Sequence, residues 1–541
     1  MRINWQILFP VLLTISFQVA SATGKISVSF LQGYDPDRPE DPVSRQILDL
    51  AKREPKLDPQ KWGGLSLPGA GGRAAFMLSM AGDSAPDIYQ CWFHIMRHDI
   101  EQGFLYPLNE WLGDDRDGDG NISDAEAKWD GWKNVPPLWR EVATKDGKVY
   151  GIPQAGIWYY GIVYRKDLVK QAGIDPEYVP ATWDEFFKWC QRLTFPRKTV
   201  AGAKLNRGQR AFGAENRPWG WLPWVQSAGG ELIVRDNGQW RANFDSDAAV
   251  AAAEFFKKLA WSPWVRNPAN GEPLDVSEAD IAAGQTVDEK SGKVIKFAKE
   301  DVIRGVVRAL PRLTQDLPLL FAQGEIVALF SGAELVEQLT RDANLPPEMV
   351  GIMPFPARDA TCRPVLQAHK HFYGMTERAG RRSKAERDMI WRCLESLASG
   401  DVNDRNVRQK VLEGNARWCK PGDLARLGLS EYLEEVPHSV RTMYERLEKG
   451  EIASCTEPYA GFWQAVSDLV DRRLLGMLLA DGGEDLDCRA VLKSINDDAN
   501  RGLMFKIPES EMAAKRPLAR IVFAVALIVV IAIAYLLRKT E

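Results

Sequence analysis

The sequence predicts an α/β fold with more than one domain, and three observations support this. Strand-like and helix-like segments alternate along residues 26–92 and again along residues 147–194, a pattern typical of parallel sheets covered by helices. The chain has 541 residues, enough for two or more domains. Its 45% hydrophobic and 26% charged residues are an ordinary globular composition.

The N-terminal stretch predicts an exported protein. Arg2 gives a short basic start, an apolar run ends near Val19, and Ala20-Ser21-Ala22 has the small residues of a cleavage site. This organisation is that of a secretory signal peptide, so residues 1–22 are not expected to join the fold. No cysteine follows the cleavage site, and a lipid-anchored start is therefore not expected.

The first α/β stretch follows the signal. "KISVSFLQGYD" alternates and then breaks at Gly33, as a strand running into a loop would. A proline-rich segment then leads into a helix. The stretch "WGGLSLPGAGGRAAFMLSMAGDSAPDIYQCW", residues 62–92, predicts a strand, a glycine turn, a helix, a turn and another strand.

The second α/β stretch begins with "DGKVYGIPQAGIWYYGIVYRKDL". A helix is predicted over 181–194, where Thr182 can act as the N-cap and Glu185 follows three residues later. Another helix is predicted over 244–260. Residues from about 265 to 315 are polar and rich in turns, which predicts a surface insertion, and helices dominate from about 380 to 500.

The C-terminal end predicts a membrane anchor. Residues 521–537 are apolar without a charge, between Arg520 and Arg538, and their length is at the low end for a membrane-spanning helix. A buried core helix is the alternative. With a signal peptide in front, the body is expected outside the cytoplasmic membrane and a short tail inside, with residues 506–520 as a linker.

The order of several segments resembles the extracellular solute-binding proteins of ABC importers, specifically the family that binds sugars and oligosaccharides. The segments are "AGDSAPDIYQCW", "GFLYPLNEWL", "DGKVYGIPQAGIWYYGIVYRKDL", "PWGWLPWVQSAGGELI", "FDSDAAVAAAEFF" and "FAQGEIVALFSG". The resemblance implies two α/β lobes joined by a hinge, of the type II periplasmic-binding-protein fold. It also implies that the lobes close over a solute and present it to a membrane permease.

The resemblance implies the following division of the chain. The first lobe is expected to comprise residues 23–158 and 372–424, and the second lobe residues 159–371. Residues 425–505 are expected to form C-terminal helices. The sequence departs from the family pattern in an acidic loop at 115–126, the insertion, the C-terminal apolar run, and "QAHKHFYGM", where the family usually has a glycine-rich strand.

The acidic loop "DRDGDGNISDAE" predicts a calcium site. Its oxygen-bearing residues stand at loop positions 1, 3, 5, 7, 9 and 12, with Gly120 at position 6, and this spacing wraps six to eight oxygens around one Ca²⁺ ion. A solvated acidic turn is the alternative. The loop is alone, which favours a structural role over a sensor. The expected ligands are Asp115, Asp117, Asp119, Asn121, Ser123 and Glu126.

Tryptophans are the first candidates for binding a sugar, because sugars present flat C–H faces that stack on indole rings while a few polar groups bind the hydroxyls. Trp219 matches the family's stacking aromatic, whereas Trp221 and Trp224 can equally be core residues. In the run Trp158-Tyr159-Tyr160 alternate rings face opposite sides of a strand, and Trp158 is expected to face the solute.

Polar candidates come from the loops after the first strands, since ligands bind beyond the carboxyl ends of strands in open α/β sheets. His371 faces the same side of a strand as His369, and the pair can bind ligand or metal, or simply pack near the hinge. Glu334 can accept hydrogen bonds from sugar hydroxyls, pair with a cationic ligand, or simply begin a solvated helix. The candidates from the first strands are Tyr34, Asp35, Asp87 and Trp92.

Several function classes have no support in the sequence. The net charge of −4 comes with no basic stripe, so no nucleic-acid partner is expected. No nucleophile or metalloprotease motif is present, and an enzyme is not expected. The sequence therefore predicts a membrane-anchored, extracytoplasmic protein that captures a carbohydrate for an ABC permease. A non-sugar solute, a carbohydrate-active hydrolase needing paired carboxylates and a ligand-binding sensor remain alternatives.

Overall fold

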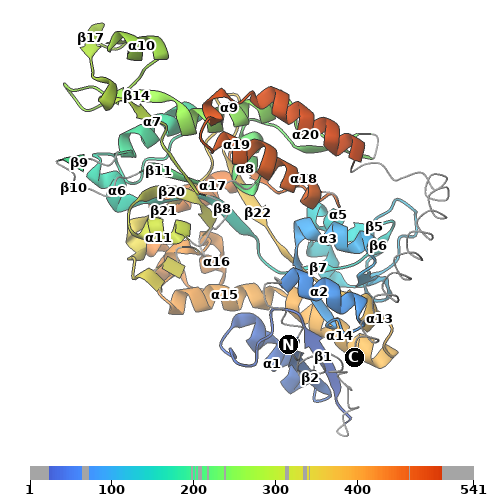
Figure 1. Cartoon of the computed structure of the whole chain (residues 1–541). Helices are drawn as coiled ribbons and strands as arrows, with labels where there is room; N and C mark the ends of the chain where they lie inside the picture. The colour runs from blue at the N-terminus through green and yellow to red at the C-terminus, as the bar shows by residue number, and fades with distance from the viewer. Residues whose placement is uncertain are drawn as a thin grey trace, which may run out of the picture. The chain divides into compact units, whose positions relative to one another are not determined.

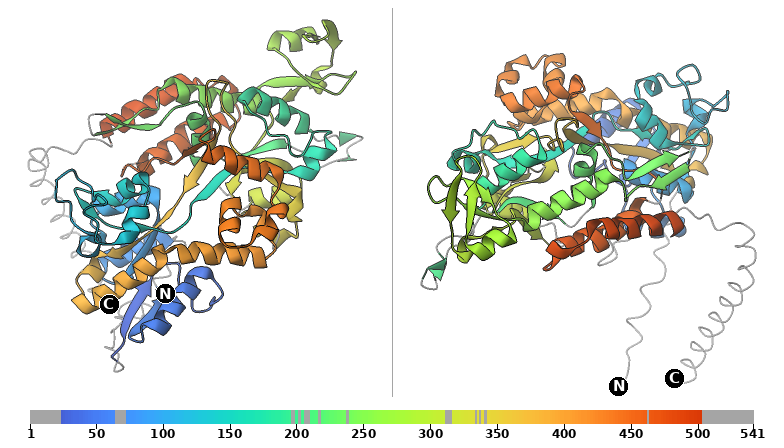
Figure 2. Two further views of the ribbon diagram at one scale, coloured as in Figure 1. Left: turned by 180° about the vertical axis from the view of Figure 1, so that it is seen from behind. Right: turned by 90° about the horizontal axis from the view of Figure 1, so that it is seen from above.

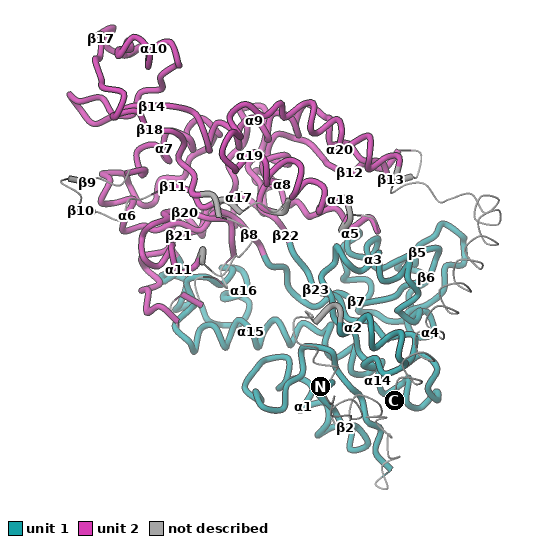
Figure 3. The backbone as a smooth tube through the Cα atoms, in the orientation of Figure 1, with its two compact units in different colours: residues 1–158, 369–436 teal, residues 159–368, 437–541 magenta. Residues whose placement is uncertain are grey.

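A computed structural model describes residues 24–502 apart from some short gaps, and it divides the chain into two compact units. Unit 1 comprises residues 1–158 and 369–436, and unit 2 residues 159–368 and 437–541 (Figure 3). From the sequence, the chain was expected to return from the second lobe to the first after residue 371, whereas in the structure it returns after residue 368. The C-terminal helices were expected to be a separate part, whereas the chain groups with unit 2 from residue 437. The gaps are 64–71, 196–198, 201–202, 205–209, 216–217, 237–238, 311–315, 333–334, 336–337, 340–341 and 462.

Unit 1 is built on a six-stranded mixed sheet in the order β2-β1-β3-β23-β4, with β7 also paired to β23. Figure 1 labels β1, β2 and β7 of this sheet. β1 pairs in parallel with β2 and β3, whereas β23 runs antiparallel to β3. The β2 strand precedes the stretch "WGGLSL" where the sequence predicted a strand. The strands are β1 (Ile26–Phe30), β2 (Leu57–Lys61), β3 (Ile88–Trp92), β4 (Leu105–Tyr106), β7 (Ile152–Pro153) and β23 (His371–Thr376).

The helices of unit 1 start where the local chemistry favours a helix. Asp41 caps the first of them, because its carboxylate accepts from the backbone N–H groups of Val43 and Ser44 and Pro42 occupies the first turn. The helices are α1 (Pro42–Arg53), α2 (Gly72–Ala81), α3 (Phe93–Glu101), α4 (Asn109–Leu112), α5 (Pro137–Ala143), α13 (Glu377–Gly380), α14 (Lys384–Ala398), α15 (Gly400–Leu412) and α16 (Pro421–Arg426).

Unit 2 contains a seven-stranded mixed sheet in the order β19-β11-β20-β8-β22-β24, with β21 also paired to β8. Two of its strands join the units: β8 starts at Trp158 and β22 ends at His369. The strands are β8 (Trp158–Arg165), β11 (Arg210–Glu215), β19 (Val307–Leu310), β20 (Ile326–Gly332), β21 (Val350–Met353), β22 (Val365–His369) and β24 (Ala453–Cys455).

The sequence predicted an N-cap at Thr182 in unit 2, and the structure confirms it. The Thr182 hydroxyl accepts from Glu185 N–H, and Ser246 caps the next long helix. The C-terminal helix α20 lies along α9 (Figure 2). The main helices are α6 (Lys166–Gln171), α7 (Trp183–Leu193), α8 (Pro218–Ser227), α9 (Asp247–Trp261), α11 (Asp316–Ala322), α17 (His438–Glu448), α18 (Trp463–Val470) and α20 (Cys488–Gly502).

The polar segment after α9 forms an appendage of unit 2. It stands away from the unit's main sheet (Figure 1) and has a small core of its own, made by Val265, Val276 and Phe297. Its elements are β14 (Pro263–Arg266), β15 (Pro273–Asp275), α10 (Glu278–Ala283), β16 (Gln285–Asp288), β17 (Lys293–Lys296) and β18 (Ile303–Arg304).

The predicted signal peptide, the linker and the C-terminal apolar run lie outside the described residues. Among the helices that the structure does describe, none combines the length and apolar character that a membrane crossing requires. The seven cysteines all lie in the described part of the chain, and none of them forms a disulfide there.

Candidate functional site

Four half-buried side chains meet on unit 1 where its chain passes to and from unit 2. Trp92 ends β3, His371 begins β23 directly opposite it in the antiparallel pairing, and Trp158 begins β8. Gln90 lies two residues before Trp92 and therefore on the same face of β3. We call Gln90, Trp92, Trp158 and His371 the aromatic–histidine cluster.

The rings of this cluster are in direct contact. The His371 ring centroid lies 3.9 Å from that of Trp92 and 4.7 Å from that of Trp158, and the two indoles are 6.1 Å apart. His369 also packs edge-on against Trp92, at 5.8 Å. Because the clustered side chains are only half-buried, they offer apolar ring surface beside polar nitrogens, which is the composition of a small-ligand site.

Gln90 sets the proton arrangement of His371. Its amide nitrogen lies 3.1 Å from His371 Nδ1 and 3.3 Å from the Tyr373 hydroxyl. An amide nitrogen only donates, so Nδ1 accepts and the neutral ring carries its proton on Nε2. His371 can then donate from Nε2 to a ligand oxygen.

Burial keeps His371 neutral. Desolvation, followed by the charges of His369 and His94, lowers the pKa of His371 from 6.5 to about 4. The imidazole is therefore uncharged at neutral pH, which agrees with the proton arrangement that Gln90 requires.

This shift predicts how stability depends on pH. The unfolded chain takes up a proton at His371 between pH 6.5 and about 4, whereas the folded chain does not, so stability is lost as the pH falls through this window. His371→Gln is expected to flatten the fall in melting temperature over this range. The exposed His438→Gln is the matched control, and an unchanged slope in His371→Gln would contradict the assignment.

Lys370 connects the two segments of unit 1 at which the chain passes to and from unit 2. Its Nζ donates to the Gly156 carbonyl at 2.6 Å and lies 5.8 Å from the Trp139 ring centroid. Gln154 N–H donates to the His371 carbonyl at 2.9 Å, close by. Burial lowers the pKa of Lys370 from 10.5 to about 8. Among the described residues no carboxylate pairs with this ammonium group.

The loop after β1 holds two further predicted residues. Tyr34 is largely buried against Phe30, with ring centroids 5.4 Å apart. Asp35 is half-buried and accepts from Lys61 Nζ at 2.7 Å, which lowers the pKa of Asp35. A Cβ placed on Gly33 would lie 3.5 Å from the Tyr373 hydroxyl, so this loop approaches the residue that Gln90 contacts.

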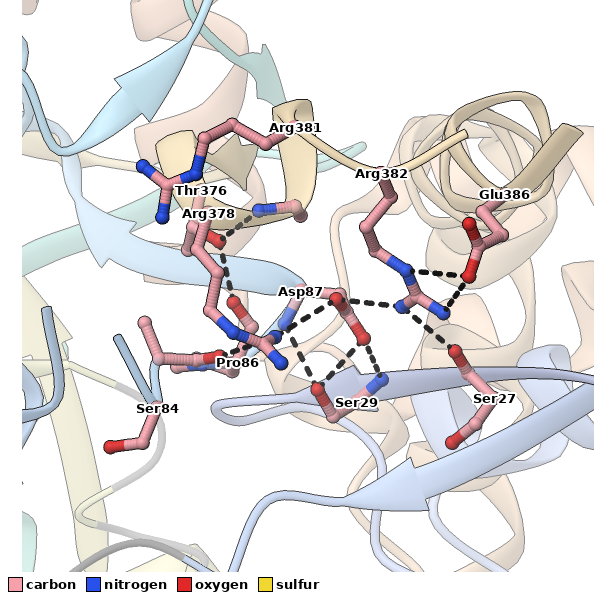
Figure 4. Close-up of polar contacts among 12 residues, drawn as sticks. Ser27, Ser29, Ser84, Pro86, Asp87, Thr376, Arg378, Arg381, Arg382 and Glu386 are labelled. Atoms are coloured by element: carbon pink, nitrogen blue, oxygen red, sulfur yellow. Dashed lines mark hydrogen bonds and ion pairs between the residues drawn. The ribbon is translucent and has the colours of Figure 1, made fainter. Parts of the chain in front are cut away.

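The structure gives Asp87 a different role from the predicted one. The residue precedes β3, so it lies about 16 Å of strand away from Trp92. It is 1% exposed, accepts from the Ser29 N–H and hydroxyl at 2.9 Å each, and pairs with Arg382 at 2.8 Å (Figure 4). Arg378 lies 3.5 Å away. Through these contacts Asp87 connects β1 with the segment before α14 inside unit 1, and its carboxylate is not available to a solute.

Trp221 also fails to fit the predicted binding role. It is fully buried in the core of unit 2, as is Trp224. Both residues belong to α8, which packs against α9 instead of placing them at the end of a strand. The backbone of Trp219 belongs to α8, but its side chain and the whole of Glu334 lie outside the described residues.

The predicted calcium loop folds around its own carboxylates. Oxygens of Asp115, Asp117 and Glu126 lie within 4.8 Å of one another. Asp115 accepts from the N–H groups of Gly118 and Gly120 at 2.8 and 2.9 Å. Gly120 has a φ of 88°, a left-handed conformation that suits glycine at the sharp turn of a calcium loop.

Glu126 closes the loop. Its carboxylate accepts from Ser123 through both hydroxyl and N–H, and from the Arg116 and Asp117 N–H groups, which lowers the pKa of Glu126 from 4.5 to about 2. Beneath the loop, Ile122 is buried and its carbonyl accepts from Trp132 Nε1 at 3.0 Å. Asp119, Asn121 and Ser123 remain exposed.

Sequence reasoning missed two residues of the site. Gln90 stands two positions before Trp92, and the alternation of side chains along a strand could have placed both on one face. Lys370 gave no such signal, because its importance depends on Gly156, which is more than 200 positions away in the chain.

Comparisons with known proteins agree with this architecture. The family described as "Bacterial extracellular solute-binding protein" matches residues 65–359. A curated relative, the diacetylchitobiose-binding protein DasA of Streptomyces coelicolor, is 23% identical over 296 residues, which is 54% of this chain and 59% of that protein. The chain therefore spans less than two thirds of the length of this relative.

Solved structures share the fold at low sequence identity. An ABC substrate-binding protein of Listeria monocytogenes in complex with cycloalternan has a TM-score of 0.58 and 16% identity, with 89% of this chain and 100% of that chain covered. UgpB of Mycobacterium tuberculosis in complex with glycerophosphocholine has a TM-score of 0.53 and 16% identity, with 88% and 97% covered.

Proposed function

This chain belongs to the bacterial extracellular solute-binding protein family, and from that membership we propose that it captures a carbohydrate outside the cytoplasmic membrane for an ABC permease. The family is one of binding proteins, and no catalytic step is proposed. The observation that carries the carbohydrate assignment is the aromatic–histidine cluster, in which two half-buried indoles flank an imidazole donor.

The cluster supports a saccharide for physical reasons. Indole faces cover the C–H faces of a sugar ring, and the Nε2 proton of His371 can bind a hydroxyl oxygen. The curated relative binds diacetylchitobiose and one structural neighbour holds cycloalternan, which agrees with this assignment. A polyol phosphate or another non-sugar solute is the second candidate, favoured by the glycerophosphocholine complex of UgpB.

A thermal-shift screen tests this proposal. A ligand that binds only the folded state raises the melting temperature by mass action. The protein is expected to respond to one saccharide class among chito-oligosaccharides, glucans and uronates, and not to polyol phosphates or peptides. A response to peptides or polyol phosphates alone would reject the carbohydrate assignment, and consumption of the saccharide would favour a hydrolase.

The membrane anchor is a separate part of the proposal. Residues 521–537 form the apolar run expected to hold the body on the extracytoplasmic side, with residues 1–22 as the export signal. In a bacterial host, the chain truncated after residue 505 is expected to leave the membrane fraction for the soluble extracytoplasmic fraction. Retention of the truncated chain in the membrane fraction would reject the anchor.

We further propose that residues 115–126 hold a structural Ca²⁺ ion. All six loop positions that supply ligands to Ca²⁺ carry residues with a side-chain oxygen. The carboxylates of Asp115, Asp117 and Glu126 converge. Carboxylate and carbonyl oxygens are the ligands that Ca²⁺ prefers, and the ion would offset the repulsion among these acids.

Calcium is accordingly expected to stabilise unit 1. At a concentration about one hundred times the dissociation constant, binding adds about 2.7 kcal/mol to the free energy of unfolding. The double variant Asp117→Asn/Asp119→Asn keeps side-chain oxygens for the turn hydrogen bonds but removes two charges, and is expected to lose most of this gain. Asp114→Asn, an exposed neighbour outside the ligand set, is the control. Equal melting temperatures with calcium and with chelator would reject the site.

A further inference from the structure

A buried glutamine lies opposite His371 in the sheet of unit 1. The pairing of β7 with β23 continues one residue beyond β7, because Gln154 N–H donates to the His371 carbonyl at 2.9 Å. Residues directly opposite each other in an antiparallel pair point their side chains to the same face, with Cβ atoms about 5 Å apart. Gln154 therefore shares a face with His371 and with Trp92, which is the opposite neighbour of His371 on β3.

The carboxamide of Gln154 has a buried oxygen without a hydrogen-bond partner. The residue is 4% exposed, and its Oε1 atom accepts no hydrogen bond from any residue that the structure describes. Leaving a buried acceptor unpaired is costly, and native proteins retain few such groups. This one lies beside the cluster that presents half-buried rings and a donor to a ligand.

Two other glutamines show what is particular to Gln154. Gln46 and Gln226 also have an unpaired Oε1 atom, but the other end of each amide holds the fold. Gln46 Nε2 donates to the Ser396 hydroxyl at 3.1 Å, and Gln226 Nε2 donates to the Thr456 carbonyl at 2.6 Å. For Gln154, within the described part of the chain, only the backbone N–H forms a hydrogen bond. The fold therefore gives the amide of Gln154 no structural partner.

We propose that Gln154 is a further solute-binding residue, whose Oε1 accepts from a saccharide group that itself accepts the Nε2 proton of His371. Rotation about the bonds of the glutamine side chain brings Oε1 to the solute. The inference rests on the proposed function, because it adds a specificity-determining residue to the same site. A hydroxyl and an acetamido group both combine a donor with an acceptor, and the probes of the experiment distinguish them.

Gln154→Met tests this assignment in the full-length protein, because methionine keeps the length of the side chain and removes its polar groups. Removing an unpaired buried acceptor does not cost stability, so the melting temperature without saccharide is expected to stay equal or to rise. Affinity is expected to fall about tenfold. Calorimetric titration measures the loss with diacetylchitobiose, which carries acetamido groups, with maltotriose, which carries hydroxyls without them, and with digalacturonate as the uronate.

Gln46→Met is the matched control and is expected to do the opposite: it loses the hydrogen bond to Ser396, so the melting temperature falls while affinity is unchanged. A loss confined to diacetylchitobiose assigns the acetamido group to Gln154, and a loss with maltotriose assigns a hydroxyl. Unchanged affinity in Gln154→Met would overturn the inference and leave the carbohydrate receptor standing. A lower melting temperature or failure to fold would show that the amide serves the fold, which also overturns it. Binding of none of these saccharides by the unaltered protein would overturn both.

Discussion

Replacing Asp87 with alanine is expected to lower the free energy of unfolding by about 3 kcal/mol, because it removes a buried carboxylate that pairs with half-buried Arg382 and leaves that residue only Glu386. The loss extends beyond one pair. Ser29 loses the acceptor for its N–H and hydroxyl, and Arg378 loses a neighbouring carboxylate. The substitution therefore removes a tie between β1, the start of β3 and the segment that leads into α14.

Urea denaturation followed by circular dichroism measures this effect. Asp83→Asn is the matched control, because Asp83 belongs to the same segment but makes an exposed ion pair with Arg381, which is worth at most about 1 kcal/mol. Asparagine also tolerates the φ of 54° at position 83. Equal stability of the two variants would show that the buried network is not a structural tie.

Replacing Trp92 or Trp158 with alanine is expected to weaken binding of the recognised saccharide by at least about tenfold. Each substitution removes the ring surface against a sugar, and each also removes a contact of His371 with the indole. Aromatic anchors of this type dominate binding energies because they exclude water over a large area.

Tryptophan fluorescence or calorimetric titration measures the loss. Trp240→Ala is the matched control: Trp240 is half-buried, like the cluster tryptophans, and packs edge-on against Tyr459 at 5.2 Å in unit 2. Unfolding curves establish that the variants remain folded. Wild-type affinity in both cluster variants would remove the aromatic–histidine cluster from the binding site.

The sequence predicted the architecture well where local chemistry decides it. The helix caps at Thr182 and Ser246 follow from hydroxyl groups placed before apolar helices. The alternation of strands and helices predicted the α/β units, because periodicity reports which faces are buried. The place of residues 437–502 was not predictable in this way, since it depends on packing between distant segments.

The candidate site was predictable only in part. Trp92, Trp158 and His371 were identified from the strand pattern and the family resemblance, and the structure brings them into contact. Asp87 was assigned to the wrong environment, and of the two positions left open for Trp221 the structure shows the core, because a sequence does not show which polar groups neutralise one another or which side of a helix faces a core. Pairing with Arg382 involves a residue almost 300 positions later.

The most direct test of the central claim is calorimetric titration of the purified full-length protein with the saccharide class found in the thermal screen, followed by recovery of the ligand. We expect saturable binding with a stoichiometry near one and a chemically unchanged saccharide, because the proposed function is capture of the solute without a catalytic step. Absence of binding to every saccharide class, or recovery of cleaved sugar, would contradict this account.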